Sequence, residues 1–203
     1  MKKNKLFFTT VRLATDGMLI ALYLVLSIYC SFNAGVLRFT TDGFPIIICG
    51  FIFGPIDGLI VGSLGAFLSQ MIMYGFSATT LLWILPAAAR GLIIGLVAKA
   101  CRYNPKFPIV IISIIFSSLI VTVLNTVAIF VDAKVYGYPA AVLGISLVYR
   151  ISAGVLSAVV YAAVTYPLLT SLKKSGISER LRGKFSEVGH SENFEKYKIK
   201  SGG

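Results

Sequence analysis

Residues 44–95 read FPIIICGFIFGPIDGLIVGSLGAFLSQMIMYGFSATTLLWILPAAARGLIIG, and this stretch decides what kind of fold the chain can have. It is apolar almost throughout and rich in glycine, and its charged residues are Asp57 and Arg90. An arginine at the centre of a membrane helix costs about 2.5 to 3.5 kcal/mol on insertion scales, so it is kept where other groups of the protein satisfy it. The stretch therefore predicts a bundle of membrane helices with a polar interior.

The composition of the whole chain leads to the same class. The 203 residues are 57% hydrophobic and their mean hydropathy is +0.85, which lies outside the range of soluble domains. In lipid each backbone polar group needs a partner within its own helix or within a closed barrel. Because the apolar runs are continuous and lack the alternation of barrel strands, we expect an all-α membrane protein with six transmembrane helices, located in the cell membrane.

The formal net charge of +11 matters less than where the charges lie. Most of the 19 Lys and Arg fall in three places, namely Lys2, Lys3, Lys5 and Arg12; Lys99, Arg102 and Lys106; and the tail from Lys173 onward. Since basic loops stay on the cytoplasmic side, both termini and the connector between the fourth and fifth helices are predicted to be cytoplasmic. The basicity indicates topology and contact with a lipid surface rather than with nucleic acid.

This topology divides the chain into three regions. Residues 1–9 form a cytoplasmic N-terminus, residues 10–172 form the six-helix transmembrane domain, and residues 173–203 form a basic cytoplasmic tail with too few large apolar residues to build a core. The first residues resemble the charged part of a signal peptide, but no AxA-like cleavage site follows them. We therefore expect the apolar segment that follows these residues to be retained as the first helix.

The helices are expected at residues 10–32, from 39 or 44 to 54, at 55–74, 80–98, 109–131 and 140–172. Residues 44–74 can also be interpreted as one kinked span. That interpretation gives five crossings and places the basic tail outside, so the charge distribution favours two spans, with Pro55 in the first turn of the third helix.

Small residues at a spacing of four predict close approaches between helices. Ala14, Gly17 and Ala21 share one side of the first helix, where the approaching helix belongs either to this chain or to a partner protein. The third helix carries a longer set, which we expect to pack internally: Gly58, Gly62, Gly65, Ala66 and Ser69. Asp57 stands at the start of that helix, where a carboxylate suits the helix N-terminus, and is predicted to have a structural capping role.

Several polar residues are expected to converge on the outer half of the bundle. They are Gln70, Tyr74 and Trp83, together with Arg38, Asn33 and Thr41 of the first outer loop. Tyr74 or Trp83 taken alone suits an interfacial aromatic belt equally well. Asn125 and Arg150 either pair structurally within the bundle or line a polar pocket, whereas Arg90, followed by two glycines at helical spacing, is predicted to be structural.

Enzyme chemistry has little support in the sequence. The one histidine, His190, lies in the tail, so histidine-based triads and zinc sites within the membrane are excluded, and no metal or cofactor is predicted. The chain has no GxxxxGK[ST] phosphate loop and therefore does not hydrolyse ATP by that route.

The pattern from Arg38 through GFPIIICGFIFGPIDGLIVGSLGAFLSQ to LWILPAAARGLIIGL, with the six-helix layout, resembles the substrate-binding S-components of energy-coupling factor (ECF) transporters, in particular the folate-type branch. The resemblance covers about Ala14 to Leu172. Ala66 stands where the folate-type pattern has an acidic residue, so the implied ligand is folate-like or another small anionic compound.

The resemblance also implies partners and a binding site. S-components capture a vitamin or a similar micronutrient from outside and associate with a transmembrane coupling protein and two cytoplasmic ATPases. In the family, small residues of the first helix dock on the coupling protein, which assigns that role to Ala14, Gly17 and Ala21. By position, the implied substrate-binding residues are Arg38, Gln70, Tyr74, Trp83, Asn125, Tyr149 and Arg150.

Two other classes of function stay open from the residues alone. One is a membrane scaffold or assembly subunit without a ligand of its own. The other is a stand-alone secondary carrier, which is disfavoured because the membrane segments lack an acidic relay beyond Asp16.

Overall fold

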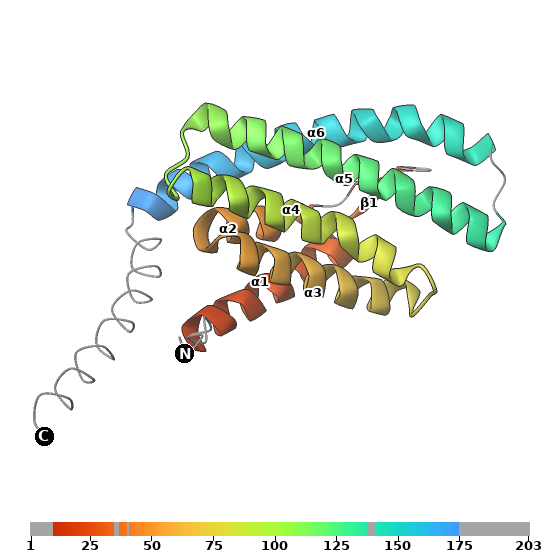
Figure 1. The fold of residues 1–203 in the computed structure, drawn as a ribbon, viewed down its shortest axis with the longest axis horizontal. Coiled ribbons are helices and arrows are strands. Elements are labelled where there is room, and N and C mark those ends of the chain that lie inside the picture. Colours follow the sequence, from red (N-terminus) through yellow and green to blue (C-terminus); the bar gives the residue numbers. More distant parts are fainter. Residues whose placement is uncertain (1–9, 35–36, 40, 138–140, 175–203) are drawn as a thin grey trace, which may run out of the picture.

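The computed structural model describes residues 10–34, 37–39, 41–137 and 141–174. Within them the elements follow one another as α1 (Thr10–Tyr29), β1 (Phe32–Ala34), β2 (Leu37–Phe39), α2 (Gly43–Phe53), α3 (Pro55–Tyr74), α4 (Thr80–Ala100), α5 (Phe107–Tyr136) and α6 (Ala141–Lys174). The expected all-α membrane fold is confirmed, with one short antiparallel hairpin added to it (Figure 1). The predicted N-terminal segment 1–9 and nearly all of the tail 173–203 lie outside the described residues, so the division into domains stays a prediction.

Every described helix except α2 is long and apolar enough to cross a membrane. The 11 residues of α2 extend about 16 Å at 1.5 Å per residue, roughly half of a hydrocarbon core. The break between α2 and α3 falls at Gly54, whose φ of 106° favours glycine, and Pro55 then begins α3. Two separate helices are therefore confirmed, and the interpretation as one kinked span is wrong.

The predicted helix ends differ from the observed ones mainly in the outer loops. The loop expected at residues 33–43 contains β1 and β2, with Phe32 opposite Phe39 and Asn33 opposite Arg38. Helix α5 continues beyond its expected end at Val131, because the following residues suit a helix until Gly137, which adopts the left-handed conformation of a helix C-cap.

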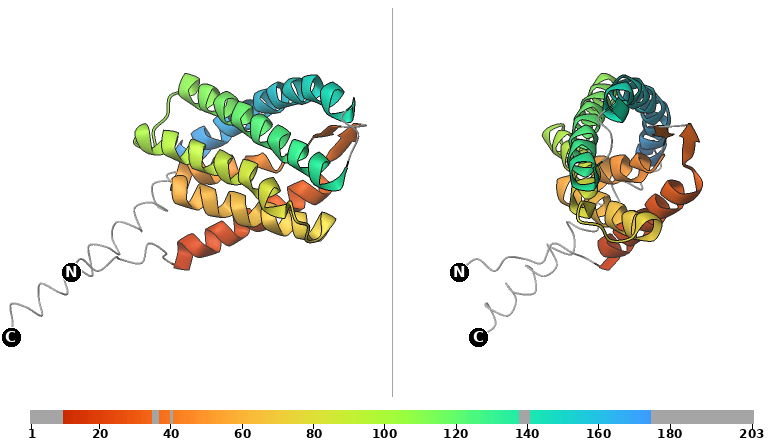
Figure 2. Two further views of the ribbon diagram at one scale, coloured as in Figure 1. Left: turned by 45° about the vertical axis from the view of Figure 1, so that its right-hand side comes forward. Right: turned by 90° about the vertical axis from the view of Figure 1, so that its right-hand side faces the viewer.

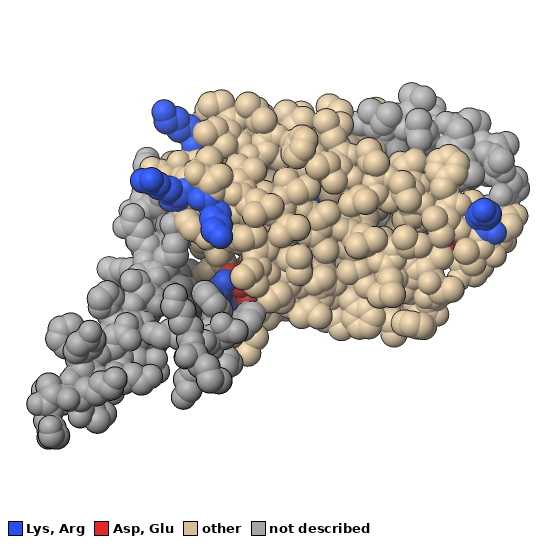
Figure 3. Space-filling view, viewed as in Figure 1, with Lys and Arg blue, Asp and Glu red and all other residues tan. Residues whose placement is uncertain are grey.

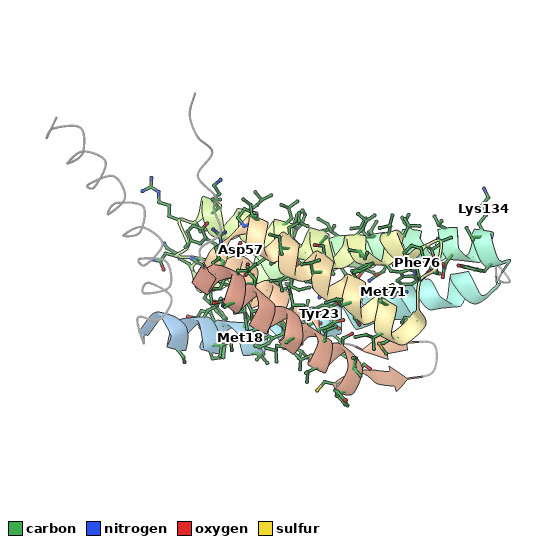
Figure 4. All side chains as sticks on the ribbon, turned by 90° about the horizontal axis from the view of Figure 1, so that it is seen from below. Met18, Tyr23, Asp57, Met71, Phe76 and Lys134 are labelled. Carbon is green, nitrogen blue, oxygen red and sulfur yellow. The ribbon has the colours of Figure 1, made fainter. Side chains whose placement is uncertain are left out.

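The two ends of the bundle differ in what they carry. The start of α1, the end of α6 and the α4–α5 connector lie at one end, whereas the hairpin lies at the other (Figures 1 and 2). The Lys and Arg side chains of the visible face gather mainly at the first of these ends (Figure 3). Lys134 lies at the opposite end (Figure 4). We call these the connector end and the hairpin end.

The glycines of α3 allow it to pack closely on two neighbours. A Cβ atom on Gly58 would lie 2.6 Å from the carbonyl oxygen of Gly91, and one on Gly62 would lie 2.5 Å from that of Ala87, so these positions leave no room for a side chain against α4. A Cβ atom on Gly65 would lie 2.8 Å from the Tyr23 ring of α1. The predicted internal contact of this set is confirmed.

Candidate ligand site and partner face

The residues predicted to bind a ligand lie on a series of neighbouring elements. Arg38 is in β2, Tyr149 and Arg150 are in α6, Asn125 is in α5, Trp83 is in the first turn of α4, and Gln70 and Tyr74 end α3. Contacts join β2 to α6, α6 to α5, α5 to α4, and α4 to α3. The hairpin, α6 and α5 are thus brought together, whereas α3 lies on the other side of α4.

The predicted residues with described side chains differ in their exposure. Gln70, Trp83 and Asn125 are half-buried, as residues of a polar interior would be, and Tyr74 is exposed at the end of α3. The side chains of Arg38, Tyr149 and Arg150 lie outside the described residues. Tyr74 therefore has the exposure of an interfacial aromatic residue, while the other three keep the exposure that a ligand contact needs.

A polar cluster in the interior joins four parts of the chain, and we call Tyr23, Asp42, Gly43, Arg90 and Tyr161 the central cluster. The Tyr23 hydroxyl of α1 donates to the Asp42 carboxylate, just before α2. The Tyr161 hydroxyl oxygen of α6 accepts from the Gly43 N–H and from the Arg90 guanidinium. The guanidinium carbon also lies 5.1 Å from the centroid of the Tyr161 ring, a distance at which a cation is attracted to the ring face.

The central cluster is close-packed as well as polar. Tyr23 and Tyr161 are 5% and 4% exposed. A Cβ atom on Gly43 would lie 2.9 Å from the Tyr161 hydroxyl oxygen and would also meet Arg90. Arg90 is packed within this cluster, and its buried Nε has no hydrogen-bond partner within the described chain; its predicted structural role stays a prediction. Sequence reasoning singled out Arg90 but missed Tyr161, because a tyrosine in an apolar helix carries no distinguishing signal.

A second polar group lies toward the connector end, between α1, α2 and α3. The Arg12 Nε donates to both Asp57 carboxylate oxygens at 2.8 and 2.7 Å, and Arg12 Nη2 forms an ion pair with the same carboxylate. Asp16 lies nearby and accepts from the Cys49 thiol at 3.8 Å. Its other carboxylate oxygen is buried without a partner within the described residues.

The role of Asp57 differs from the expected one. No side-chain cap hydrogen bond forms at the start of α3, and the carboxylate is instead 0% exposed and paired with Arg12. Leaving a buried carboxylate without a counter-charge costs more free energy than leaving a helix N-terminus without a side-chain cap. From the sequence, Arg12 is only one of the basic residues that predict a cytoplasmic N-terminus. No local pattern predicts its pairing with a residue 45 positions away.

The set of small residues on α1 points away from the bundle. Ala14, Gly17 and Ala21 are all exposed, and nothing lies within 4 Å of a Cβ atom built on Gly17. Met18, on the same face, is 73% exposed and is labelled on α1 in Figure 4. Within the described part of the chain, the exposure of these residues gives no support to the intramolecular alternative for them.

The hairpin end is also held by hydroxyl groups that the sequence analysis did not single out. The Thr79 hydroxyl, just before α4, donates to Asp132 of α5 at 2.5 Å. The Ser77 N–H donates to the Thr80 hydroxyl at 2.9 Å. These bonds fix the turn between α3 and α4 to α5, near the half-buried Trp83.

The described helices form an apolar bundle whose long members could cross a membrane, and a comparison with protein families gives the class. The family model described as "ECF transporter, substrate-specific component" matches residues 11–169, and the chain belongs to this family. It is a multi-pass protein of the cell membrane and the substrate-binding subunit of an ECF transporter, and it is a transport subunit rather than an enzyme.

Solved structures of S-components share this fold. A FolT structure with bound folic acid is 24% identical with a TM-score of 0.60, covering 80% of this chain and 95% of that chain. The S component of a bacterial ECF transporter is 24% identical with a TM-score of 0.59, covering 81% and 98%. An S-component for biotin is 14% identical with a TM-score of 0.56, covering 86% and 95%. No curated protein matches the sequence.

Proposed function

We propose that this S-component captures a vitamin or related micronutrient, folate-like or another small anionic compound, for ATP-driven uptake. One observation carries the proposal: β2 with Arg38 contacts α6 with Arg150, and α6 contacts α5 with the half-buried Asn125. Two elements that carry an arginine are thus in contact with each other, and one of them contacts a helix that carries an amide.

The chemistry of these residue types favours an anionic ligand. A guanidinium binds a carboxylate through two parallel, charge-assisted hydrogen bonds, and an amide side chain offers both a donor and an acceptor. Folic acid, bound in the similar FolT structure, and biotin, named for another similar S-component, both carry carboxylates. Gln70 and Trp83 are proposed as additional contacts, with Tyr74 and Tyr149 at the border of the site.

The proposed orientation follows from the charges. The connector end, with Arg12, Lys99, Arg102 and Lys106, faces the cytoplasm, and the hairpin end faces outward. The predicted cytoplasmic N-terminus and basic tail are consistent with this orientation. The ligand site then opens to the outside, as capture from the medium requires.

The exposed face of α1 is proposed to dock on the transmembrane coupling protein, which works with two cytoplasmic ATPases. Ala14, Gly17 and Ala21 allow a partner helix to approach closely, and their exposure supports this role. Energy would come from those ATPases, because the chain has no phosphate loop of its own.

Native mass spectrometry of the full chain, purified in detergent from cells grown in rich medium, tests the proposal. A panel of water-soluble vitamins is then added to protein freed of ligand, and binding is followed by the fluorescence of Trp83, the one tryptophan. We expect one compound at 1:1 stoichiometry. An empty protein that binds no member of the panel would contradict a ligand-binding role and favour a scaffold subunit.

Variants locate the site once a ligand is known. We expect Arg38→Ala and Asn125→Ala each to weaken binding at least about tenfold, the lower range for a lost hydrogen bond to a charged group. Lys134→Ala is the matched control, since Lys134 is an exposed cation at the same end of the bundle. A loss in Lys134→Ala equal to the loss in Arg38→Ala would indicate a nonspecific charge effect.

A further inference from the structure

The connection between α1 and α2 is fastened to α1 at its base. The Thr41 hydroxyl donates to the carbonyl oxygen of Cys30, directly after α1, at 3.4 Å. One residue later, Asp42 accepts from Tyr23, two turns before the end of α1. The stretch that carries β1 and β2 is therefore closed by two bonds, one to α1 and one to the residue that directly follows it.

The same stretch is fastened on its other side to α4 and α6. Gly43, the first residue of α2, donates its N–H to Tyr161, which also accepts from Arg90. Residues 41–43 are thus bonded to Tyr23 of α1 on one side and to Tyr161 of α6 on the other, and Tyr161 is in turn bonded to Arg90 of α4. A displacement of this stretch relative to α1 has to break or strain the Tyr23–Asp42 bond.

Tyr23 stands on the side of α1 that is opposite to the partner face. With 3.6 residues per turn, position 23 is half a turn from position 14 when both are projected along the helix axis. Accordingly Tyr23 is buried and Ala14 is exposed. A bond that fixes Tyr23 therefore fixes the rotation of α1 about its axis, and with it the direction in which the partner face points.

We propose that Tyr23 is a positioning residue that relates the arrangement of residues 41–43 to the orientation of the partner face on α1. The part that this positioning role has in transport rests on the proposed function. In that function, a ligand that contacts β2 and α6 changes the position of Asp42, and the bond between Asp42 and Tyr23 changes the orientation of α1 accordingly. The bond itself is testable without any ligand.

The structure offers a clean variant and a matched control. The Tyr23 ring packs against Gly65 of α3, so Tyr23→Phe keeps the ring and removes the hydroxyl that meets Asp42. Tyr29→Phe removes the same atom from the same helix, but Tyr29 is 80% exposed. Asp42→Ala removes the acceptor of the bond, whereas an asparagine would keep an amide oxygen that can still accept.

Hydrogen–deuterium exchange of the full chain in lipid nanodiscs, without ligand, is the first test. Tyr23→Phe and Asp42→Ala should each speed exchange about fivefold both in residues 41–46 and in residues 19–27, the factor for one hydrogen bond. The double variant should exchange no faster than either single one, and Tyr29→Phe should match the unchanged chain. Acceleration confined to the segment that carries the substitution would overturn the proposal.

The second test uses the ligand found in the vitamin panel and the ECF coupling protein with its ATPases. In the unchanged chain, the affinity for the coupling protein should differ between the ligand-bound and ligand-free states, and in Tyr23→Phe this difference should become smaller. The isolated Tyr23→Phe variant should bind the ligand with an affinity within about twofold of that of the unchanged chain. An affinity for the coupling protein that does not depend on ligand, or a difference that Tyr23→Phe leaves unchanged, would overturn the positioning role. Failure of every vitamin to bind would instead contradict the proposed function and leave the exchange test to decide on Tyr23.

Discussion

In the Arg12–Asp57 pair, one residue allows another, far along the chain, to be buried as a charged group. Asp57 is fully buried and its carboxylate contacts Arg12 through both oxygens. Its negative charge would be very costly in that position without the arginine. The sequence indicated that Asp57 was structural, but its partner depends on how α1 lies against α3, and no local pattern encodes that arrangement.

Removing one member of this pair should destabilise the chain more than removing both. We expect Arg12→Leu to cost about 3 to 5 kcal/mol because it leaves Asp57 buried and unpaired. Arg12→Leu combined with Asp57→Leu should recover most of that loss. The measurement is the free energy of unfolding in a mixed-micelle denaturation, and a double variant less stable than Arg12→Leu would contradict the expectation.

Helices α1 and α3 carry similar sets of small residues but use them differently. Gly62 of α3 lies against the backbone of α4, whereas Gly17 of α1 faces open space. The spacing alone predicted close contact in both helices, and left open for α1 whether the contact is internal. Only the packing of the whole bundle shows which set of small residues contacts another helix of the chain and which set is exposed.

A leucine at Gly62 should therefore affect stability, whereas a leucine at Gly17 should affect partner binding. Gly62→Leu should lower the stability of the isolated chain by about 1 to 3 kcal/mol or more, because the added atoms meet the Ala87 carbonyl. Gly17→Leu should leave the thermal unfolding midpoint unchanged and reduce co-purification with the coupling protein at least tenfold. Normal co-purification by Gly17→Leu would remove α1 from the proposed docking interface.

Sequence patterns predicted the elements better than the contacts between them. Length and hydropathy gave the long helices, and Gly54 with Pro55 marked the break after α2. The hairpin of β1 and β2 was missed because three-residue strands are too short to show an alternation. The central cluster was found only in part, since Tyr23 and Tyr161 resemble ordinary apolar helix residues until α1 and α6 are placed beside α2.

The charge distribution of the whole molecule sets its proposed orientation. Arg102 lies in the connector between α4 and α5, and Lys134 lies at the far end of α5. Helix α5 separates these two residues by about a membrane thickness. The single positive charge of Lys134 does not outweigh the several basic residues of the connector, so the positive-inside rule still favours a cytoplasmic connector.

This orientation can be tested by cysteine labelling in intact cells. In a chain whose natural cysteines, Cys30, Cys49 and Cys101, are replaced by alanine, Lys134→Cys should react with a membrane-impermeant maleimide added outside. Arg102→Cys should react only after the membrane is permeabilised. The reverse pattern would place the hairpin end in the cytoplasm and contradict capture from the medium.

The uncovered face of α1 has a consequence for the surrounding bilayer. In the absence of a partner, the exposed surface around Gly17 would contact acyl chains, which lose conformational freedom against the helix. The docking proposed for this face would return those chains to the bulk lipid, so part of the driving force for assembly would come from the membrane rather than from the proteins. Chain length and saturation of the host lipids should accordingly tune how long the transporter stays assembled.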